Sequence, residues 1–334
     1  MRQFIIAALL LIGLSGCTTP QQAQFSHDVV TTETPWSHQN FDRNPNGFTF
    51  AIVSDLWGGY RNGIFDVAAV QVNQLRPEFV LSVGDLIDGG SEDRARLHQE
   101  WDGFDALAAK INAPFFFAGG NHDLTNPTMR EVWQGRYGTR YYHFRYGDAL
   151  FLILDSEDMD VDRMMAVYHA RAKAIAVIDA DGYDAAKDME YFHMPERVSG
   201  TIGHDQSAYF EAVIADNADA KWTFLFMHKP TWRAAEGKSL ARIEKALEGR
   251  NYSVFAGHEH SFSHRKRNGM DYTILGTTGG SQRPNDPNGF DHIGLIHFDG
   301  TAPSIAHIRM DGLLGIDGQL PAGSDGLCFQ ASEC

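Results

Sequence analysis

The sequence has 334 residues, of which 43% are hydrophobic, so it can bury a sizeable core as one large domain or two modest ones. Acidic residues outnumber basic ones by 43 to 28, and the formal net charge is −15. This balance argues against a nucleic-acid groove, which needs a basic stripe to neutralise phosphates. It also argues against attachment to anionic lipid through a polybasic patch.

The first residues have the pattern of an export signal. Arg2 supplies a positive charge, and Phe4 to Leu14 form an apolar run of signal-peptide length that is too short to span a bilayer. Leu14-Ser15-Gly16-Cys17 resembles a bacterial lipoprotein signal with Cys17 as the lipidated residue. We therefore expect residues 1–16 to be removed and the protein to face the periplasm, anchored to the membrane only through a lipid on Cys17. An ordinary secretory signal is the alternative, and it would leave the protein soluble in the periplasm or secreted.

Two segments flank the main domain. Residues 17–46 are rich in Gln, Thr and Pro and show little apolar periodicity, which indicates a tether. Residues 313–334 are interpreted as a C-terminal tail. This tail contains Cys328 and Cys334, for which a short local disulfide is plausible in an exported protein, with free thiols as the alternative.

Residues 47–312 are expected to form one domain that begins with alternating strands and helices. The apolar runs Phe48–Val53, Phe79–Val83 and Phe115–Ala118 predict strands. Apolar periodicity predicts helices over 64–75 and 92–110, between these strands. Strands separated by helices form βαβ units, so we expect the three strands to be parallel.

The second half of the domain continues this pattern after an interruption. Strands predicted at 140–146 and 149–154 precede an acidic, alanine-rich segment, 157–203, which we interpret as an insertion. This insertion is either a lid over the site or a solvated helical excursion. Beyond it we predict alternating elements: helices at 206–215 and 239–248, and strands at 221–227 and 252–256. Two later strands, 272–275 and 294–298, are expected to be antiparallel.

Potential metal ligands follow five of the predicted strands. They are Asp55, Asp85, Asn121 with His122, His228, and His258 with His260. One such coincidence is common, but five in strand–helix order are hard to explain as turn or capping residues. Because open α/β sheets build their sites at the carboxyl ends of the strands, we expect these side chains to form one site.

The order of these residues resembles the calcineurin-like metallophosphoesterase superfamily, whose pattern is D-x-H, G-D, G-N-H-[DE], a lone H and G-H-x-H. Four of the five blocks match: Gly84-Asp85, Gly120-Asn121-His122-Asp123, His228 and Gly257-His258-Glu259-His260. The resemblance covers residues 48–298. It implies an α/β fold, a four-layer α/β/β/α sandwich with mixed sheets and with the site at the C-terminal ends of the strands.

The resemblance also implies two metal ions. Asp85 would bridge both ions. The remaining ligands would divide between two sites, with Asn121, His228 and His258 at one and Asp55 and His260 at the other. Mixed oxygen and imidazole ligands suit Mn, Fe, Zn or Co better than Ca or Mg.

Two further residues of the third block would be catalytic. By resemblance, His122 would not bind metal but would stabilise the transition-state oxygens or protonate the leaving group. Asp123 would orient the His122 imidazole and raise its pKa, as a carboxylate partner does.

The first block departs from the family pattern. Trp57 stands where D-x-H places histidine, and an indole has no lone pair for a metal. The site near Asp55 is therefore expected to be weak, to recruit Asp88 as an extra oxygen ligand, or to be absent. Secondary candidates are Arg61, Arg283 and His292, and for the arginines a solvated loop charge is the alternative.

The function predicted from these motifs is a metal-dependent phosphoesterase that hydrolyses phosphate mono- or diesters by attack of a metal-bound hydroxide. The alternative is a catalytically impaired metal-binding or ligand-binding module that lost the first-block histidine. The acidic composition favours a small-molecule or lipid-linked phosphate ester as partner, and it disfavours nucleic acid.

Overall fold

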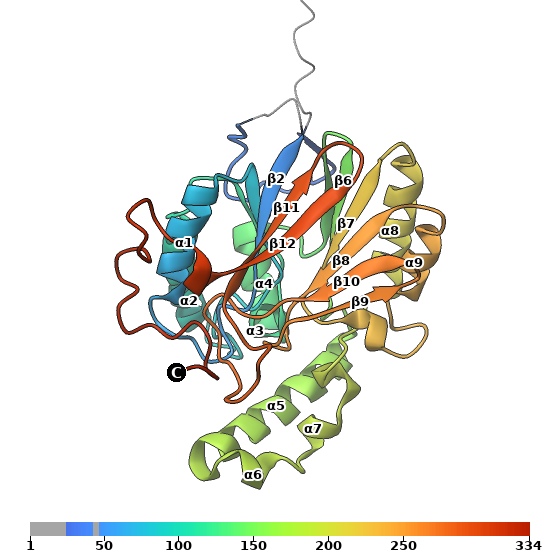
Figure 1. The fold of residues 1–334 in the computed structure, drawn as a ribbon. Coiled ribbons are helices and arrows are strands. Elements are labelled where there is room, and N and C mark those ends of the chain that lie inside the picture. The colour runs from blue at the N-terminus through green and yellow to red at the C-terminus, as the bar shows by residue number, and fades with distance from the viewer. Residues whose placement is uncertain (1–24, 43–46) are drawn as a thin grey trace, which may run out of the picture.

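The computed structural model describes residues 25–42 and 47–334. Two mixed β-sheets pack face to face, and helices cover their outer faces (Figure 1). The seven-stranded sheet has the order β1-β5-β6-β7-β8-β10-β9, and the five-stranded sheet has the order β12-β11-β2-β3-β4. This arrangement confirms the four-layer α/β/β/α sandwich expected from the sequence.

The five-stranded sheet carries the first three blocks of site residues. Its strands β2 (Phe48–Val53), β3 (Phe79–Ser82) and β4 (Phe115–Phe116) are parallel, as predicted. The antiparallel strands β11 (His292–Phe298) and β12 (Pro303–Arg309) complete it. The three parallel strands are mostly apolar, as expected for a sheet that is covered on both faces.

The seven-stranded sheet carries the later blocks. Its parallel strands are β6 (Ala149–Ile153), β7 (Trp222–Phe226), β8 (Tyr252–Ala256) and β10 (Met270–Ile274). The antiparallel strands are β1 (Phe25–His27), β5 (Tyr142–Tyr146) and β9 (Ser263–Arg267). The two strands predicted near 272 and 294 therefore lie in different sheets and do not pair with each other.

Side chains that alternate along each strand build a separate core on each face. On β2, Phe50 and Ile52 join an aromatic core between the sheets, whereas Ala51 and Val53 pack beneath the helices. The helices over the five-stranded sheet are α1 (Ile64–Leu75), α2 (Arg94–Ala108), α3 (Asn121–Leu124) and α4 (Pro127–Tyr137). The helices over the other sheet are α8 (His204–Asp216) and α9 (Ala241–Ala246). Two tightly packed sheets give the strand ends a rigid base.

The insertion is a helical lobe that leaves β6 and returns before α8. Its elements are α5 (Val161–Asp181), α6 (Tyr183–Ala186), α7 (Glu190–His193) and a 3-10 turn, η1 (Pro195–Arg197). A parallel bridge between Glu157 and Thr201 holds its two ends together. Figure 1 shows the lobe projecting from the body, on the side of the sandwich where α3 lies. The Asp160 side chain caps α5 by accepting from the Arg163 amide at 2.8 Å.

Residues 25–42, which were predicted to belong to the tether, pack onto the domain. Strand β1 pairs with β5, and Trp36 is buried and bridges to Phe116. Phe25, Trp36 and Phe41 supply apolar surface that the polar composition of this segment concealed. The predicted signal peptide, 1–16, and Cys17 lie outside the described residues. Within residues 25–42 and 47–334, no helix is both long enough and apolar enough to cross a bilayer.

The predicted C-terminal tail is also part of the domain. Leu327 and Phe329 pack against Ile64 and Val67 of α1, together with Met310. Cys328 and Cys334 form a disulfide, the first of the two alternatives that the sequence left open. The tail reads as polar in sequence because only a few apolar residues anchor it.

Arg61 ties this tail to the rest of the domain. Its guanidinium binds the buried Asp291 carboxylate at 2.7 Å and the Cys328 carbonyl at 2.6 Å. These acceptors occupy its donors, so Arg61 has a structural role. The hypothesis that Arg61 binds phosphate is therefore not supported.

Two histidines on β11 and β12 are held without charge. His292 is buried, and its ring centroid lies 5.2 Å from that of His307. Within the described residues, neither nitrogen of His292 has a hydrogen-bond partner, and neither has Nδ1 of His307. Burial, together with the neighbouring imidazole of His307, lowers the pKa of His292 to about 3. Burial and the nearby His264 lower the pKa of His307 to about 4.

This pair predicts a loss of stability in acid. Both pKa values lie below the ordinary value of about 6.5, so the unfolded chain binds protons first as the pH falls. The free energy of unfolding is expected to drop by about 1.4 kcal/mol per pH unit for each histidine as the pH falls from 6.5 towards 4. Urea unfolding of wild type and of a His292→Leu, His307→Leu double variant at several pH values measures this slope. The double variant is expected to have a shallower slope of unfolding free energy against pH than the wild type. His204→Ala, at an exposed histidine, is the control and is expected to keep the wild-type slope. Equal slopes in all three proteins would contradict the assignment.

Candidate metal centre

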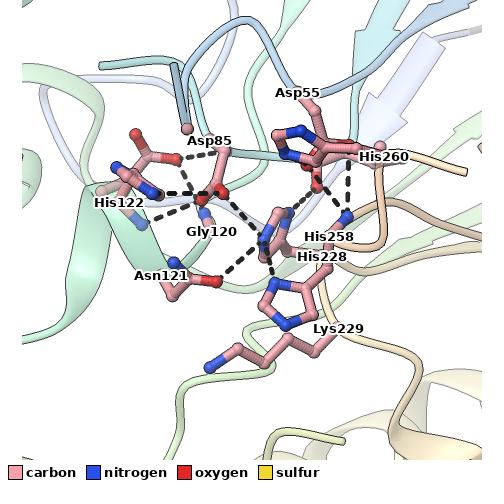
Figure 2. A network of polar contacts seen from close by, with 12 residues as sticks. Asp55, Asp85, Gly120, Asn121, His122, His228, Lys229, His258 and His260 are labelled. Carbon is pink, nitrogen blue, oxygen red and sulfur yellow. Dashed lines mark hydrogen bonds and ion pairs between the residues drawn. The ribbon is translucent and has the colours of Figure 1, made fainter. Parts of the chain in front are cut away.

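The sandwich brings all five blocks of predicted ligands to one place. Asp55 and Asp85 follow β2 and β3, Asn121 begins α3, His228 follows β7, and His258 and His260 follow β8 (Figure 2). Ligand atoms of Asp85, His228 and His258 lie within 4.8 Å of one another, and so do those of Asp55, Asp85 and His260. Asp85 is thus common to two groups that could each hold a metal ion.

Strained backbone positions mark the same residues. In the described part of the chain, seven residues other than glycine have a positive φ, and four of them are Asp55 (48°), Asp85 (58°), His258 (75°) and His260 (55°). Such conformations cost of order 1–3 kcal/mol each and persist where the surrounding structure enforces them, often at functional sites. Neighbouring glycines allow the close approach: a Cβ on Gly120 would lie 2.3 Å from Oδ1 of Asp85.

Each of the three histidines is oriented by a backbone carbonyl. His228 Nδ1 lies 3.0 Å from the Val83 carbonyl oxygen. His258 Nε2 lies 2.6 Å from that of Arg197, and His260 Nδ1 lies 2.5 Å from that of Ser281. A carbonyl accepts only, so each of these nitrogens carries the proton and donates. The other nitrogen of each ring faces the remaining candidate ligands: Asp85 for His228, the His228 ring for His258 and Asp55 for His260.

The first group converges on one point. His228 Nε2 lies 3.1 Å from Asn121 Oδ1, 3.1 Å from Asp85 Oδ2 and 3.2 Å from His258 Nδ1. The three neighbours of Nε2 offer lone pairs, and a proton on Nε2 can serve only one of them at a time. Without that proton, Nε2 offers a lone pair as well. A single divalent cation satisfies all of them, so this donor set fits a transition metal with nitrogen and oxygen ligands.

Protons compete with a metal at this group. Burial lowers the pKa of His228, but the Asp85 carboxylate outweighs it and raises the pKa to about 9. Burial would raise the pKa of Asp85, yet the His228 and His122 imidazoles hold it well below its usual range. Metal binding at His228 therefore has to release a proton.

The second group has fewer protein ligands. His260 Nε2 lies 3.3 Å from Asp55 Oδ1, and Asp85 is shared with the first group. The Asp55 carboxylate also accepts hydrogen bonds from the Ser54 hydroxyl and, at 2.9 Å, from the His258 amide. Trp57 supplies no ligand: its ring stacks on Tyr60 with centroids 4.9 Å apart.

His122 is held by a group that the sequence did not indicate. Its Nδ1 donates to the backbone carbonyl of Asp88 at 2.7 Å, and its Nε2 accepts from Nη2 of Arg171 at 3.0 Å. Burial is the main cause that lowers its pKa, and the Arg171 charge adds to it, so the imidazole is neutral. The prediction that Asp123 orients His122 and raises its pKa is wrong.

Asp123 organises backbone instead. Its carboxylate accepts from the amides of Asp85 (2.8 Å), Leu86 (3.0 Å), Ile87 (3.2 Å) and Gly120 (2.7 Å). It is fully buried, and burial, with the nearby Asp85 charge, raises its pKa to about 7. The side chain therefore fixes the turn that presents Asp85 and the start of α3.

Asp88 does not join either group of ligands. Its carboxylate is half-exposed and pairs with Arg96 at 2.7 Å. Its contribution to the site is the carbonyl that binds His122. The turn after β3 directs the Asp88 side chain to the surface, so the expected replacement for the missing histidine is not found there.

A pocket of about 500 Å³ opens above the ligands. Asp85, Asn121, His258 and His260 form one side of it, and residues of the insertion form the other. Three arginines also line it: Arg171 and Arg197 from the insertion, and Arg283, which was a secondary candidate from the sequence. The sequence did not indicate Arg171, because nothing in its local pattern distinguishes it from a solvated helical charge. His292 is not among the lining residues.

A buried lysine holds the insertion in place. Lys229, next to the ligand His228, is 2% exposed. Its ammonium group donates to the Glu157 carboxylate at 2.9 Å and to the Glu196 carbonyl at 2.8 Å. Glu157 and Glu196 lie at the two ends of the insertion, so the metal centre and the insertion share one buried ion pair.

Comparison with known families identifies the class. The family model described as calcineurin-like phosphoesterase matches residues 48–262. That range includes every candidate ligand described above. The chain belongs to the calcineurin-like phosphoesterase family, whose members are metal-dependent hydrolases of phosphoric esters.

Three individual proteins resemble this chain, with 33% sequence identity or less over the matched residues. The serine/threonine-protein phosphatase CPPED1 of Rattus norvegicus is 33% identical over 128 residues, which is 36% of this chain and 38% of that protein. A dimetal phosphatase from Danio rerio has a TM-score of 0.54 and 14% identity, and the match covers 79% of this chain and 96% of that one. A purple acid phosphatase from yellow lupin has a TM-score of 0.52 and 14% identity, covering 85% of this chain and 52% of that one. At these identities the two structures show a shared fold.

The position of Arg171 generates a prediction. Arg171→Ala is expected to lower kcat/KM for a phosphate ester by roughly 100-fold, because it removes a charged donor that lines the pocket beside His122 and the candidate ligands. Steady-state kinetics with the metal-loaded protein measures the effect. Lys173→Ala, an exposed cation on the same helix, is the matched control and is expected to leave the rate unchanged. Equal rates in the two variants would show that Arg171 does not contact the substrate.

Proposed function

We propose that this protein hydrolyses phosphate mono- or diesters at a centre that holds two transition-metal ions. The observation that carries the proposal is the shared Asp85 carboxylate, which belongs to both groups of convergent ligand atoms. A carboxylate common to two cations keeps them close enough to grip one phosphoryl group. The mixed nitrogen and oxygen donors suit Mn, Fe, Zn or Co.

The ligands divide as their contacts suggest. Asn121, His228 and His258, with Asp85, would hold one ion, and Asp55 and His260, with Asp85, would hold the other. When bound, such ions polarise the phosphoryl oxygens and lower the pKa of a coordinated water. Backbone carbonyls that fix the three imidazoles keep the donors in place before any ion arrives.

The chain itself positions the substrate. Arg171 donates to His122 Nε2, so the neutral imidazole holds the guanidinium, whose remaining N–H groups can bind phosphoryl oxygens. The His122 proton is on Nδ1, where it is donated to the Asp88 carbonyl, so we assign His122 the role of orienting Arg171 towards the transition-state oxygens. Arg197 and Arg283 are further cations that line the pocket.

Export and partners are part of the proposal. We propose an exported protein, anchored through Cys17 or soluble, that acts on a small-molecule or lipid-linked phosphate ester. The Cys328–Cys334 disulfide supports an oxidising compartment. The net charge of −15 supports a partner other than nucleic acid.

Removing ligands tests the catalytic centre. Loaded with Mn²⁺ or Zn²⁺, the wild type is expected to release product from aryl phosphates or bis-aryl phosphates, and an Asn121→Ala, His258→Ala variant is expected to fall to background. His264→Ala, at a half-exposed histidine paired with Asp271, serves as the control and should retain activity. Hydrolysis that persists in the double variant would refute the proposal.

Metal counting tests the alternative of an impaired module, which rests on Trp57. We expect about two ions per chain at saturating metal, with the ion at Asp55 and His260 lost first on dialysis, because its site has fewer protein ligands. Asp55→Asn should reduce the count to about one under all conditions. Elemental analysis of folded protein gives the ratio. A wild type that never binds more than one ion and hydrolyses no ester would favour the impaired module.

A further inference from the structure

The insertion presents an apolar surface to the reactive centre. Arg171, Ile175 and Ile178 follow one another at helical spacing on α5, and all three line the pocket. Arg171 is next to His122, so the two isoleucines continue outward from the phosphoryl site. The adjoining stripe of α5, with Val167 and Ala170, packs against Met194 and fixes the helix in this orientation.

The return segment of the insertion completes this surface. We call the following residues the apolar wall: Ile175, Ile178, Tyr183, Tyr191, Phe192 and Val198. Four of the candidate metal ligands line the same pocket, and we call them its polar floor: Asp85, Asn121, His258 and His260. One pocket therefore has a polar floor and an apolar side. The Arg197 guanidinium lies over the Phe192 ring, 4.9 Å from its centroid, and holds that ring beside the floor.

Folding alone gives no reason for this exposure. Ile175 is 39% exposed, Tyr183 56% and Val198 42%. These are three of the eight large hydrophobic residues that are exposed in the described part of the chain, and all three line one pocket. Apolar side chains gathered in a concave site next to a reactive centre are typical of ligand binding.

We propose that the apolar wall binds the alcohol part of the substrate, which is therefore a phosphate ester of an apolar alcohol. This inference rests on the proposed phosphoesterase function and names the substrate class. In the reaction, water adds to phosphorus, the bond between phosphorus and the alcohol oxygen breaks, and the alcohol leaves with a proton. A pocket of about 500 Å³ has the size of a small-molecule site, so it takes a hydrocarbon or aromatic group beside the phosphate.

A phosphoprotein is the competing occupant. A peptide bound in extended form needs partners for its backbone amides, but side chains of the apolar wall offer aromatic and aliphatic surface. The wall is also local to the pocket and ends within one helical lobe. We therefore assign it to a compact apolar group, and phosphopeptides become an arm of the test.

The test compares esters whose leaving groups have similar basicity. Ethyl, butyl, hexyl and benzyl phosphate are assayed beside glycerol 3-phosphate and a phosphoserine peptide, with release of inorganic phosphate as readout. Each methylene buried against the wall is expected to raise kcat/KM about fourfold until the wall is covered. Hydrolysis of all esters at equal efficiency would overturn the inference but leave the proposed function intact. A peptide preferred over hexyl phosphate would also overturn it.

Two variants and a control connect this selectivity to the wall. Ile175→Ser and Ile178→Ser are each expected to reduce the ratio of hexyl to ethyl phosphate efficiency at least fivefold. Val161→Ser removes an apolar side chain that is 57% exposed on the same helix and does not line the pocket, and it should keep the wild-type ratio. Thermal melting monitored by circular dichroism checks that the variants are folded. An unchanged ratio in both isoleucine variants would overturn the assignment.

Binding of non-hydrolysable phosphonates separates the inference from the proposed function. Hexylphosphonate is expected to bind at least tenfold more tightly than methylphosphonate by isothermal titration calorimetry, and the difference should shrink in Ile175→Ser. Equal affinity for the two phosphonates would overturn the inference. If the phosphonates bind with the expected difference but no ester is hydrolysed, the proposed function fails while the apolar ligand class stands.

Discussion

The Asp85 carboxylate is the interaction on which the rest of the site depends. It is buried, it lies 3.1 Å from His228 Nε2, and it accepts the His122 amide at 2.8 Å. Burial of a negative charge is costly unless cations and donors surround it. The glycine turns, the strained backbone at Asp85 and the four amides held by Asp123 all serve to place this one charge between two sets of ligands.

The site residues at the strand ends could be predicted from the sequence. An apolar run that stops at a glycine and is followed by Asp, Asn or His can be recognised from the order of residues alone. The family motifs then identified Asp85, Asn121, His228 and His258 as neighbours. Strands β9 and β12 were not predicted. Every residue of β9 is exposed and none is apolar, and no residue of β12 is fully buried. The segment 25–42 was misjudged for a related reason: three aromatic residues without periodicity cover a sheet edge.

Roles that depend on direction could not be predicted. The sequence placed Asp123 beside His122, yet helix α3 turns the Asp123 carboxylate towards backbone amides and leaves the imidazole to the carbonyl of Asp88. Asp88 therefore contributes to the site through its backbone carbonyl and not through the carboxylate that was predicted to bind metal. Arg171 is separated from His122 by 49 positions in the chain, and only the fold of the insertion brings the two together. Side-chain direction at turns is decided by a few backbone angles, which composition and spacing do not determine.

The Arg197 carbonyl has a wider consequence. It belongs to the insertion, and it accepts a hydrogen bond from Nε2 of His258, which sets the tautomer of that imidazole. Lys229 adds a second link, because it joins the segment next to His228 to both ends of the same lobe. A movement of the lobe therefore changes the hydrogen bond that orients the His258 imidazole. At the proposed metal centre, thermodynamic reciprocity then requires that metal occupancy changes the preferred position of the lobe. Selectivity for the alcohol and affinity for the ion are thus one linked property, so mutations that remodel the lobe for a new substrate also alter the ion's hold.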